Sequence, residues 1–385
     1  MQLLEEVLAP DGWAYASTPP IDDRDPGRFH ALFGRDSLIT ALQVLPERPD
    51  IARATLRALA ALQGRREDPE TDEEPGKILH EHWPDPPARV VEVGRPVRCG
   101  VLRHYASADS TSWFLVVLAT LGDLGLAREL EPAWRAAADW LERALERGGG
   151  FVRYGPRRAP GGLQHQGWRD TTDPLDPETH GAAIIREDGT APLLPLADAD
   201  TQAVAVAALD ALAALSGESR FRARAGELRA TVRRHFGRET MAIEADGREV
   251  RGGGSQLGWL LWADAGPVGA AERLCEPDVL TPWGLRTLSE RHPQFDSVGY
   301  HRGTVWPFDS WLGWGGLRAA GRGAEAERVR SGVLEAIRRL GGAPELYAVD
   351  AGGPRPVAID NRIQAWTVGA RWALEYGWDG RHVVG

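Results

Sequence analysis

Residues 198–236 read DADTQAVAVAALDALAALSGESRFRARAGELRATVRRHF, and this stretch contains the pattern that decides the fold. Apolar residues recur at helical spacing over 199–215 and again over 218–236, with a short break between the two runs. Asp198 precedes the first run and can cap it, because an Asp side chain accepts hydrogen bonds from the free N–H groups of a first turn. The stretch therefore predicts a helical hairpin that begins with a polar cluster.

The same pattern recurs along the chain and predicts an all-α protein. Further helices are expected over 36–45, 49–63, 110–122, 128–147, 255–265, 268–275, 304–320, 323–340 and 362–376. Alternating strand patterns are scarce, and the best short cases are 151–154 and 240–250. The long stretches 64–108, 148–197, 237–253 and 276–303 are expected to be irregular loops, which in a compact domain usually have a functional role.

A polar cluster precedes the first helix of each expected pair. Six such hairpins closed in a ring form an (α/α)6 barrel, in which all six clusters meet at one end as the rim of a pocket. We therefore expect a single domain over 1–385, with long loops and short strands at the active-site end. The six clusters are Arg35-Asp36-Ser37, Asp109-Ser110-Thr111, Asp198-Ala199-Asp200-Thr201-Gln202, Gly254-Ser255-Gln256, His301-Arg302-Gly303-Thr304 and Asp360-Asn361-Arg362.

Composition narrows the range of functions. The 385 residues have a formal charge of −10, which gives no electrostatic footprint for nucleic acid or an anionic membrane surface. No segment approaches the ~18 consecutive apolar residues of a membrane span, and no basic signal-peptide region precedes the first helix, so we expect a cytoplasmic protein. Two cysteines exclude a disulfide framework and a cysteine zinc site, and no metal or other cofactor is expected. Fifteen tryptophans exceed six tyrosines and eight phenylalanines together, a weak indication of carbohydrate binding.

Two carboxyl groups stand out in segments outside regular structure. Asp170 lies in the loop Gln164-His165-Gln166-Gly167-Trp168-Arg169-Asp170, and Glu345 follows Pro344 inside an apolar run. Enclosed carboxyl groups of this kind suit glycoside hydrolysis, in which one protonates the leaving oxygen and the other activates water or attacks the anomeric carbon.

These residues belong to a series of motifs that is recognisable as a whole. In order they are Phe33-Gly34-Arg35-Asp36-Ser37-Leu38, Glu73-Glu74-Pro75-Gly76-Lys77-Ile78-Leu79-His80-Glu81, Asp109-Ser110-Thr111, Gly167-Trp168-Arg169-Asp170, Tyr300-His301-Arg302-Gly303-Thr304-Val305-Trp306-Pro307 and Pro344-Glu345-Leu346-Tyr347. The series resembles the amylo-alpha-1,6-glucosidase family, the glucosidase part of glycogen debranching enzymes. It is also similar to the wider group of six-hairpin glycosidases, which includes mannosylglycerate hydrolases, and the resemblance covers about residues 30–375.

The resemblance implies an (α/α)6 toroid and an inverting mechanism, with Asp170 as general acid and Glu345 as general base. Their carboxyl groups are then expected roughly 6.5–9.5 Å apart, and Asp170 is expected to be the more enclosed, with a raised pKa. The resemblance further assigns hydroxyl binding to Arg35 and Asp36 and a stacking wall to Trp306. The other expected substrate-binding residues are Trp168, His301, Arg302, Asp309, Gln364 and Trp366.

The sequence thus predicts an exo-acting, inverting α-glycosidase that removes a terminal glucosyl or related unit from a small α-glycoside or oligosaccharide. Two alternatives remain open on the same barrel. One is a sugar isomerase or epimerase with His165, His180 or His301 as its base, and the other is a catalytically silent carbohydrate-binding protein. In each case the partner is a carbohydrate rather than nucleic acid or membrane, and no pattern in the sequence specifies an oligomeric state.

Overall fold

The computed structural model describes residues 2–20, 27–92, 94–156, 162–171, 182–358 and 361–381. Helices dominate this part of the chain, and its strands are short and lie in the connections between helices. The prediction of a predominantly helical protein is therefore confirmed.

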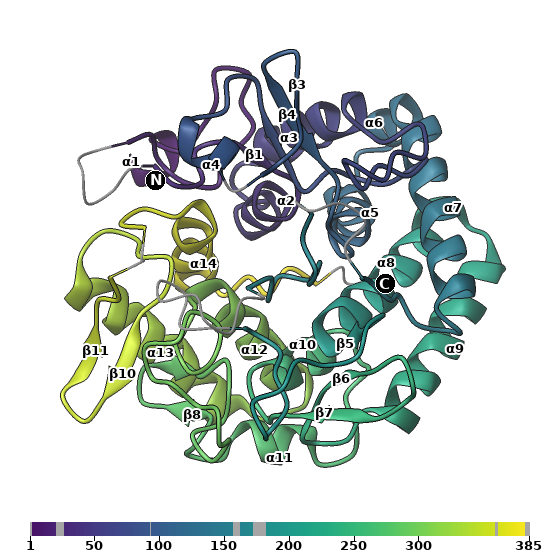
Figure 1. Ribbon diagram of the computed structural model, residues 1–385. Coiled ribbons are helices and arrows are strands. Elements are labelled where there is room, and N and C mark those ends of the chain that lie inside the picture. Colours follow the sequence, from purple (N-terminus) through teal and green to yellow (C-terminus); the bar gives the residue numbers. More distant parts are fainter. Residues whose placement is uncertain are drawn as a thin grey trace.

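A ring of helices surrounds the centre of the molecule (Figure 1). Each packs against the next in chain order and the last packs against the first, so their contacts form a closed cycle. α5 is buried from Ser110 to Ala119, which fits a helix that is apolar on nearly every face. The six ring helices are α2 (Gly34–Gln43), α5 (Ser110–Leu121), α8 (Ala199–Ser216), α10 (Gln256–Trp262), α12 (Pro307–Ala319) and α14 (Ala365–Tyr376).

A second helix packs against each ring helix, as the predicted hairpins require. These partners are amphipathic where they are long: α13 buries Val329, Val333 and Ile337 on one face. The N-terminal turn α1 contacts α14 and so supplies the sixth partner, for which the sequence pattern had given no candidate. The partners, in ring order from α2, are α3 (Pro49–Ala61), α7 (Glu131–Arg147), α9 (Ser219–His235), α11 (Ala270–Leu274), α13 (Gly323–Leu340) and α1 (Gln2–Glu5), and two further short helices are α4 (Ala88–Glu92) and α6 (Leu124–Glu129).

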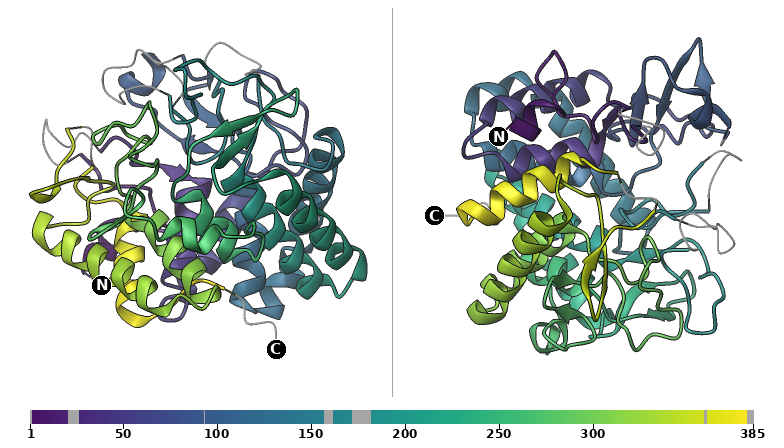
Figure 2. Two further views of the ribbon diagram at one scale, coloured as in Figure 1. Left: turned by 90° about the horizontal axis from the view of Figure 1, so that it is seen from below. Right: turned by 90° about the vertical axis from the view of Figure 1, so that its left-hand side faces the viewer.

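The strands and long connections gather at one end of the helices (Figure 2). The largest sheet has the order β1-β2-β4-β3, and three of its strands lie in 64–108, which was expected to be an irregular loop. It consists of β1 (Leu32–Phe33), β2 (Glu81–Trp83), β3 (Val97–Arg98) and β4 (Val101–His104). The smaller sheets consist of β5 (Ala197–Asp198), β6 (Thr240–Ile243) and β7 (Glu249–Arg251), of β8 (Leu280–Thr281) and β9 (Gly284–Leu285), and of β10 (Ala348–Asp350) and β11 (Gly353–Arg355).

The two strand predictions have different outcomes. The expected strand at 240–250 is present as the pair β6 and β7. The one at 151–154 is wrong, because in that segment Tyr154 makes only an isolated bridge to Leu196. Gly155 has a φ of +81° and Pro156 follows it, so the backbone turns away before a second pairing can form.

One hydrophobic cluster extends from Leu4 on α1 to Leu374 on α14 and includes residues of every ring helix. α8 is long and apolar enough by composition to cross a membrane, but 72% of it is buried inside the structure as a core helix. α10 and α12 approach each other through glycines, since a Cβ on Gly258 would lie 2.5 Å from the Cα of Gly313. This close packing brings the first turn of α10 against the middle of α12.

Candidate active site

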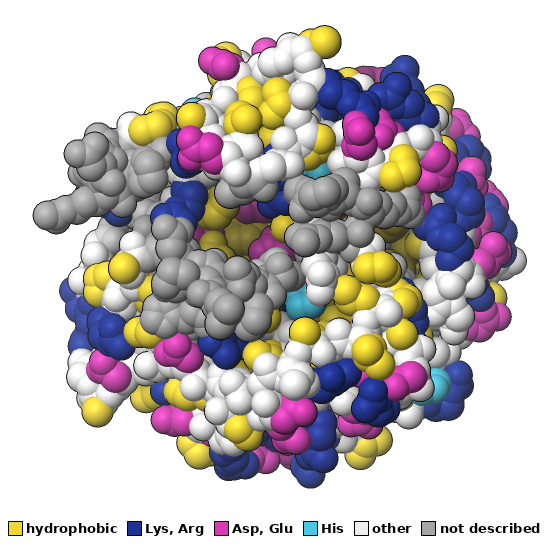
Figure 3. Space-filling model, in the orientation of Figure 1, with side chains coloured by type: hydrophobic (Ala, Val, Ile, Leu, Met, Phe, Trp, Pro, Cys, Tyr) yellow, Lys and Arg dark blue, Asp and Glu magenta, His cyan; other side chains and the backbone are white. Residues whose placement is uncertain are grey.

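Polar side chains at the N-terminal ends of the ring helices contact one another across the ring. Arg35 on α2 lies 3.5 Å from the carboxylate of Asp109, the residue that precedes α5. Gln364, which precedes α14, donates to Asp36 on α2 at 3.5 Å. Figure 3 shows a hollow at the centre of this face, with hydrophobic and acidic side chains at its bottom. The polar residues that precede or begin α2, α5 and α14 therefore lie close together at one end of these helices.

The loop that ends at Asp170 is bound to several ring helices. Arg35 donates from Nη1 to the Gly167 carbonyl at 3.0 Å, and the N–H of Ala108 donates to the Gln166 carbonyl at 2.7 Å. A Cβ on Gly167 would lie 2.7 Å from a carboxylate oxygen of Asp198, so only glycine lets the loop pass this close to α8. The backbone leading to Asp170 is thus fixed before any substrate binds.

Arg169 is the strongest of these attachments. Its guanidinium donates to Asp200 Oδ2 at 2.8 Å on α8, to Ser255 Oγ at 2.8 Å beside α10, and to the Thr287 carbonyl at 3.0 Å. The same group lies 4.3 Å from the centre of the Trp168 ring, and Arg169 is 2% exposed. A buried guanidinium with three acceptors fixes the peptide that carries Asp170, because each donor of its planar fork has a defined direction.

Asp170 lies beside a cation and keeps some contact with solvent. One of its carboxylate oxygens is 3.7 Å from Arg35 Nη2, and its side chain is 28% exposed. Burial raises the pKa of Asp170 to about 6, against the opposing effects of Arg35 and Arg95. The raised pKa agrees with the expectation for a general acid.

Glu345 lies in a closed setting with neutral hydrogen-bond donors. The Tyr300 hydroxyl donates to Oε1 at 2.6 Å, and the Asn361 side-chain amide donates to Oε2 at 3.1 Å. Its own N–H donates to the Asn361 carbonyl at 3.0 Å, so side chain and backbone are fixed by the same neighbour. Glu345 is 2% exposed. The expectation that Asp170 is the more enclosed carboxyl is therefore wrong, because Tyr300 and Asn361 cover Glu345 while the Asp170 side chain is 28% exposed.

Tyr300 relates the two carboxyl groups to each other. Its hydroxyl binds Glu345, and burial together with the charges of Glu345 and Asp170 raises the pKa of Tyr300 well above its ordinary value. The phenol therefore stays protonated and donates at any physiological pH. Both carboxyl groups act on this one ring, although they are 175 positions apart in sequence.

The expected aromatic residues form a packed wall behind this centre. Trp168 lies parallel to Trp259 at 5.9 Å, His301 lies parallel to Trp306 at 5.1 Å, and Phe308 stacks on Trp366 at 3.9 Å. The expected sugar platforms among them, Trp168, His301, Trp306 and Trp366, are between 1% and 5% exposed. In this structure they support the site from behind, and Tyr300 contacts Trp306 edge-to-face at 4.8 Å in front of it.

The remaining expected residues differ in how close they lie to the centre. Asp36 is buried, and burial raises its pKa to about 7. Gln364 reaches Asp36, whereas Asp309 is fully buried beneath α10 and accepts from Trp259 Nε1 at 2.6 Å. Arg302 is partly buried on the 299–303 turn, and burial lowers its pKa. Asp309 therefore belongs to the support of the site rather than to its open surface.

Sequence reasoning missed the roles of Tyr300, Asn361, Asp109 and Arg169, although each occurs in a motif or polar cluster that it quoted. Their roles depend on partners far away in the chain, which spacing does not reveal.

His165 is buried with a pKa lowered to about 4, and burial lowers the pKa of His301 well below its usual value. His180 and Asp360 lie outside the described residues. Among the residues that the structure describes, no group of three His, Cys, Asp or Glu side chains is arranged to hold a metal ion.

Comparisons with known proteins agree with a glycosidase. The sequence profile described as mannosylglycerate hydrolase MGH1-like glycoside hydrolase domain matches residues 114–367. No curated protein sequence matches this chain.

Solved structures match over nearly the whole chain. The GH63 mannosylglycerate hydrolase from Thermus thermophilus in complex with Tris and D-glycerate is 16% identical, with a TM-score of 0.70 over 98% of this chain and 99% of that one. Its complex with glucose is 18% identical, with a TM-score of 0.66 over 98% of each chain. An uncharacterized conserved protein from the same organism is 17% identical, with a TM-score of 0.66 over 98% of each chain. At this identity the likeness shows a shared fold.

Proposed function

The chain belongs to the mannosylglycerate hydrolase MGH1-like glycoside hydrolase family, and from this premise we propose that Asp170 and Glu345 are the acid and base of its hydrolytic site. The protein is an exo-acting, inverting α-glycosidase that removes the terminal glycosyl unit of a small α-glycoside. The observation that carries the proposal is the placement of both carboxyl groups around Tyr300, which binds one and lies in the field of the other.

The two environments suit the two roles. With a pKa of about 6, Asp170 retains a protonated fraction near neutral pH, as an acid that protonates the glycosidic oxygen must. Glu345 receives two neutral hydrogen bonds that favour its ionised form, as a base that takes a proton from water must. Inversion requires room for that water, so the two carboxyl groups should lie roughly 6.5–9.5 Å apart.

The terminal sugar is held by the N-terminal ends of α2 and α14. Asp36 and Arg35 bind its hydroxyl groups, and Gln364 orients Asp36 through their contact at 3.5 Å. Arg35 also lies between Asp109 and Asp170, so the group that holds the sugar is the group that positions the acid. Behind this arrangement His301 stacks on Trp306, and Trp168 and Trp366 each meet Trp306 edge-to-face.

We further propose that the ring and its outer helices form an (α/α)6 barrel and that residues 1–385 make up a single domain. The family favours hydrolysis over the epimerase and silent-binding alternatives. His165 and His301, two of the three candidate bases of an epimerase, are buried, and burial lowers the pKa of each. The narrower resemblance to amylo-alpha-1,6-glucosidases and a cytoplasmic location remain predictions.

The experiment is a hydrolysis panel with the purified chain. Maltose, isomaltose, trehalose, sucrose, glucosylglycerate and mannosylglycerate are incubated with the enzyme, and the released monosaccharide is measured. The similarity to a mannosylglycerate hydrolase makes the two glycerate glycosides the first substrates to test. Proton NMR of the first product then shows its anomeric form. Release of the β-anomer supports the proposal, and release of the α-anomer, or no release from any α-glycoside, contradicts it.

A further inference from the structure

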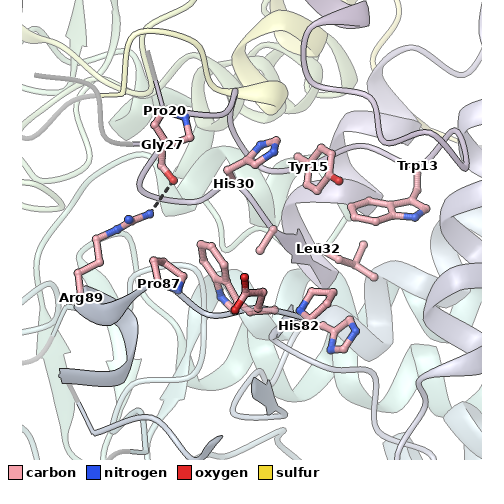
Figure 4. Close-up of a pocket in the computed structure, with 13 residues that line it drawn as sticks. Trp13, Tyr15, Pro20, Gly27, His30, Leu32, His82, Pro87 and Arg89 are labelled. Carbon is pink, nitrogen blue, oxygen red and sulfur yellow. Dashed lines mark hydrogen bonds between the residues drawn. The ribbon is translucent and has the colours of Figure 1, made fainter. Parts of the chain in front are cut away.

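A second cavity, of 400 Å³, lies between the N-terminal segment and the segment that follows β2. We call it the N-terminal groove, and it is lined on one side by Trp13, Tyr15 and His30 and on the other by His82, Asp85 and Pro87. Figure 4 shows His30, Tyr15 and Trp13 in a row along one wall, with Pro87 and His82 across from them. Its volume lies within the range of about 300–1,000 Å³ that is usual for small-molecule sites.

The first wall is a continuous run of rings. Trp13 and Tyr15 meet edge-to-face with ring centres 4.6 Å apart, and Tyr15 and His30 lie 4.0 Å apart. All three line the groove, and none of them is fully buried. Aromatic rings of this kind bind the apolar faces of flat ligands with polar edges.

Polar groups around the groove are set up to accept hydrogen bonds from a ligand. His30 donates from Nδ1 to the Ser17 carbonyl at 2.9 Å, and His82 donates from Nδ1 to the Leu102 carbonyl at 3.2 Å. A neutral imidazole that donates from Nδ1 keeps Nε2 as an acceptor, and burial beside Arg103 lowers the pKa of His82 and favours that neutral form. Asp85 adds a carboxylate at the exposed rim, and Arg89, whose guanidinium donates to the Gly27 carbonyl at 2.9 Å, adds a donor.

This combination fits one class of ligand. A carbohydrate has apolar C–H faces for the rings and many hydroxyl donors for the acceptors, whereas a purely apolar ligand would offer no donor to the Nε2 atoms of the two imidazoles or to the Asp85 carboxylate. We therefore propose that the N-terminal groove is an accessory carbohydrate-binding site that holds one or two sugar units apart from the catalytic carboxyl groups. The inference rests on the proposed function insofar as that function makes carbohydrate the ligand class of this chain.

The groove is close to the active site without being part of it. Trp83 lines the groove and donates from Nε1 to Glu81 at 2.8 Å, and Glu81 binds Arg95 at 3.1 Å. Arg95 in turn lowers the pKa of Asp170. The strand β1, which contributes Leu32 to the groove, leads directly into α2 with Arg35 and Asp36. A saccharide in the groove thus lies next to the small sheet whose strand β1 leads into α2.

The test measures sugar binding in the full-length chain with hydrolysis blocked by Glu345→Gln. Maltose and α-1,2-mannobiose are titrated by calorimetry into this parent and into versions that also contain Tyr15→Ala, Tyr15→Phe or Tyr376→Ala. Tyr376 is the matched control, because it is an exposed tyrosine on α14 with 71% of its surface free and lies outside the groove.

We expect two binding sites in the parent. Tyr15→Ala should weaken one of them by at least about tenfold, while Tyr15→Phe, which keeps the ring, and Tyr376→Ala retain both. Identical titrations of the parent and the Tyr15→Ala protein would overturn the inference. So would binding of a proline-rich decapeptide, but of neither sugar, at this groove. Hydrolysis by the enzyme with native Glu345 is assayed in parallel. If that enzyme is inactive but Tyr15→Ala still removes one sugar-binding site, the proposed function is contradicted and the accessory site is supported.

Discussion

The two sides of the candidate active site hold their carboxyl groups by different means. On the Asp170 side a charged group, Arg35, lies 3.7 Å away and the carboxyl keeps 28% of its surface exposed. On the Glu345 side two neutral donors, Tyr300 and Asn361, bind a carboxyl that is 2% exposed. Enclosure alone therefore does not identify the acid, because the more buried group is the one with hydrogen bonds that favour ionisation.

The difference has a chemical reason. An acid that protonates a leaving oxygen must reach the side from which the aglycone departs, so some exposure of Asp170 follows from its role. A base that orients one water needs a fixed direction more than access, and hydrogen bonds to both oxygens of Glu345 supply it. Substitutions on the two sides should therefore have different effects, of which the loss of a carboxyl group is the largest.

Removal of either carboxyl group should lower activity more than substitution of Arg169, Asp36 or Tyr300. We expect Asp170→Asn and Glu345→Gln each to lower kcat by about 10²–10⁴-fold on a natural glycoside while leaving binding largely intact. The two should separate on a glycosyl fluoride, whose leaving group needs no proton, so that Asp170→Asn keeps much of its rate and Glu345→Gln does not. Stopped assays on both substrates check this, and equal recovery of the two variants would contradict the division of roles.

Azide provides a control on the mechanism. No covalent glycosyl-enzyme is expected in an inverting enzyme, so azide should not restore a product of retained configuration in either variant. Mass spectrometry of the protein during turnover measures the same point directly. A trapped glycosyl-enzyme would assign a retaining mechanism instead.

Substitution of Arg169, which fixes the peptide of Asp170, should have the next largest effect on activity. Arg169→Lys keeps the positive charge but loses most of the fork that binds Asp200, Ser255 and Thr287. We expect kcat to fall by about tenfold or more with little change in KM, because misplacement of the acid affects the reaction more than binding. Thermal unfolding is measured alongside, since a weakened buried pair also destabilises the protein.

Ser255→Ala tests the contacts of Arg169 with a smaller change. It removes one of the three acceptors and leaves the Arg169–Asp200 pair intact. Its kcat should lie between those of the native enzyme and Arg169→Lys. Rates that track only the loss of thermal stability would make Arg169 a purely structural residue.

Sugar recognition at Asp36 should show an intermediate effect that depends on pH. Asp36→Ala removes a buried acceptor, and we expect KM to rise by about tenfold. Because the pKa of Asp36 is about 7, the native carboxyl gains charge as pH rises through that value and binds sugar hydroxyls more strongly. The ratio of variant to native KM should therefore grow between pH 6 and 8. A KM ratio that does not change with pH, or a variant KM equal to the native one, would mean that Asp36 has only a structural role at the start of α2.

Much of the fold could be predicted from the sequence because its signals are local. The helical periodicity of 199–215 and the polar residues at its start depend on near neighbours, and the structure has α8 at Ala199–Ser216 with Asp198 accepting from the Thr201 N–H. The partner of α14 could not be predicted in this way, because α1 is a single turn that takes its place only through packing. The sheet that precedes α5 was also missed, since its strands are two to four residues long.

The candidate site shows the same difference between features with local sequence signals and features that depend on distant residues. Asp170 and Glu345 could be singled out from their motifs, whereas the enclosure of each depends on residues distant in sequence. Asn361 covers Glu345 from 16 positions away, and Arg35 reaches the Gly167 carbonyl from 132 positions away. Spacing within a motif contains no information about such contacts, which explains why the order of burial was predicted the wrong way round.

The smallest predicted effect is on the Glu345 side and concerns Tyr300→Phe. In a plot of kcat against pH, which leaves out the effect of Asp36 on KM, the alkaline limb reports the acid, and activity should fall as pH rises through the pKa of Asp170, about 6. The acidic limb reports the base. Because the Tyr300 hydroxyl stabilises ionised Glu345 through a 2.6 Å hydrogen bond, its removal should move the acidic limb to higher pH by about one unit.

The alkaline limb should stay in place in that variant, since Tyr300 makes no hydrogen bond to Asp170 among the contacts of the described residues. The bell-shaped plot of rate against pH then becomes narrower on its acidic side, and its maximum rate falls. Rate profiles between pH 4 and 8 for the native enzyme and for Tyr300→Phe measure both limbs in one experiment, with thermal unfolding as the check on folding. Movement of the alkaline limb instead would mean that Tyr300 serves Asp170, and the assignment of the two sides would have to be exchanged.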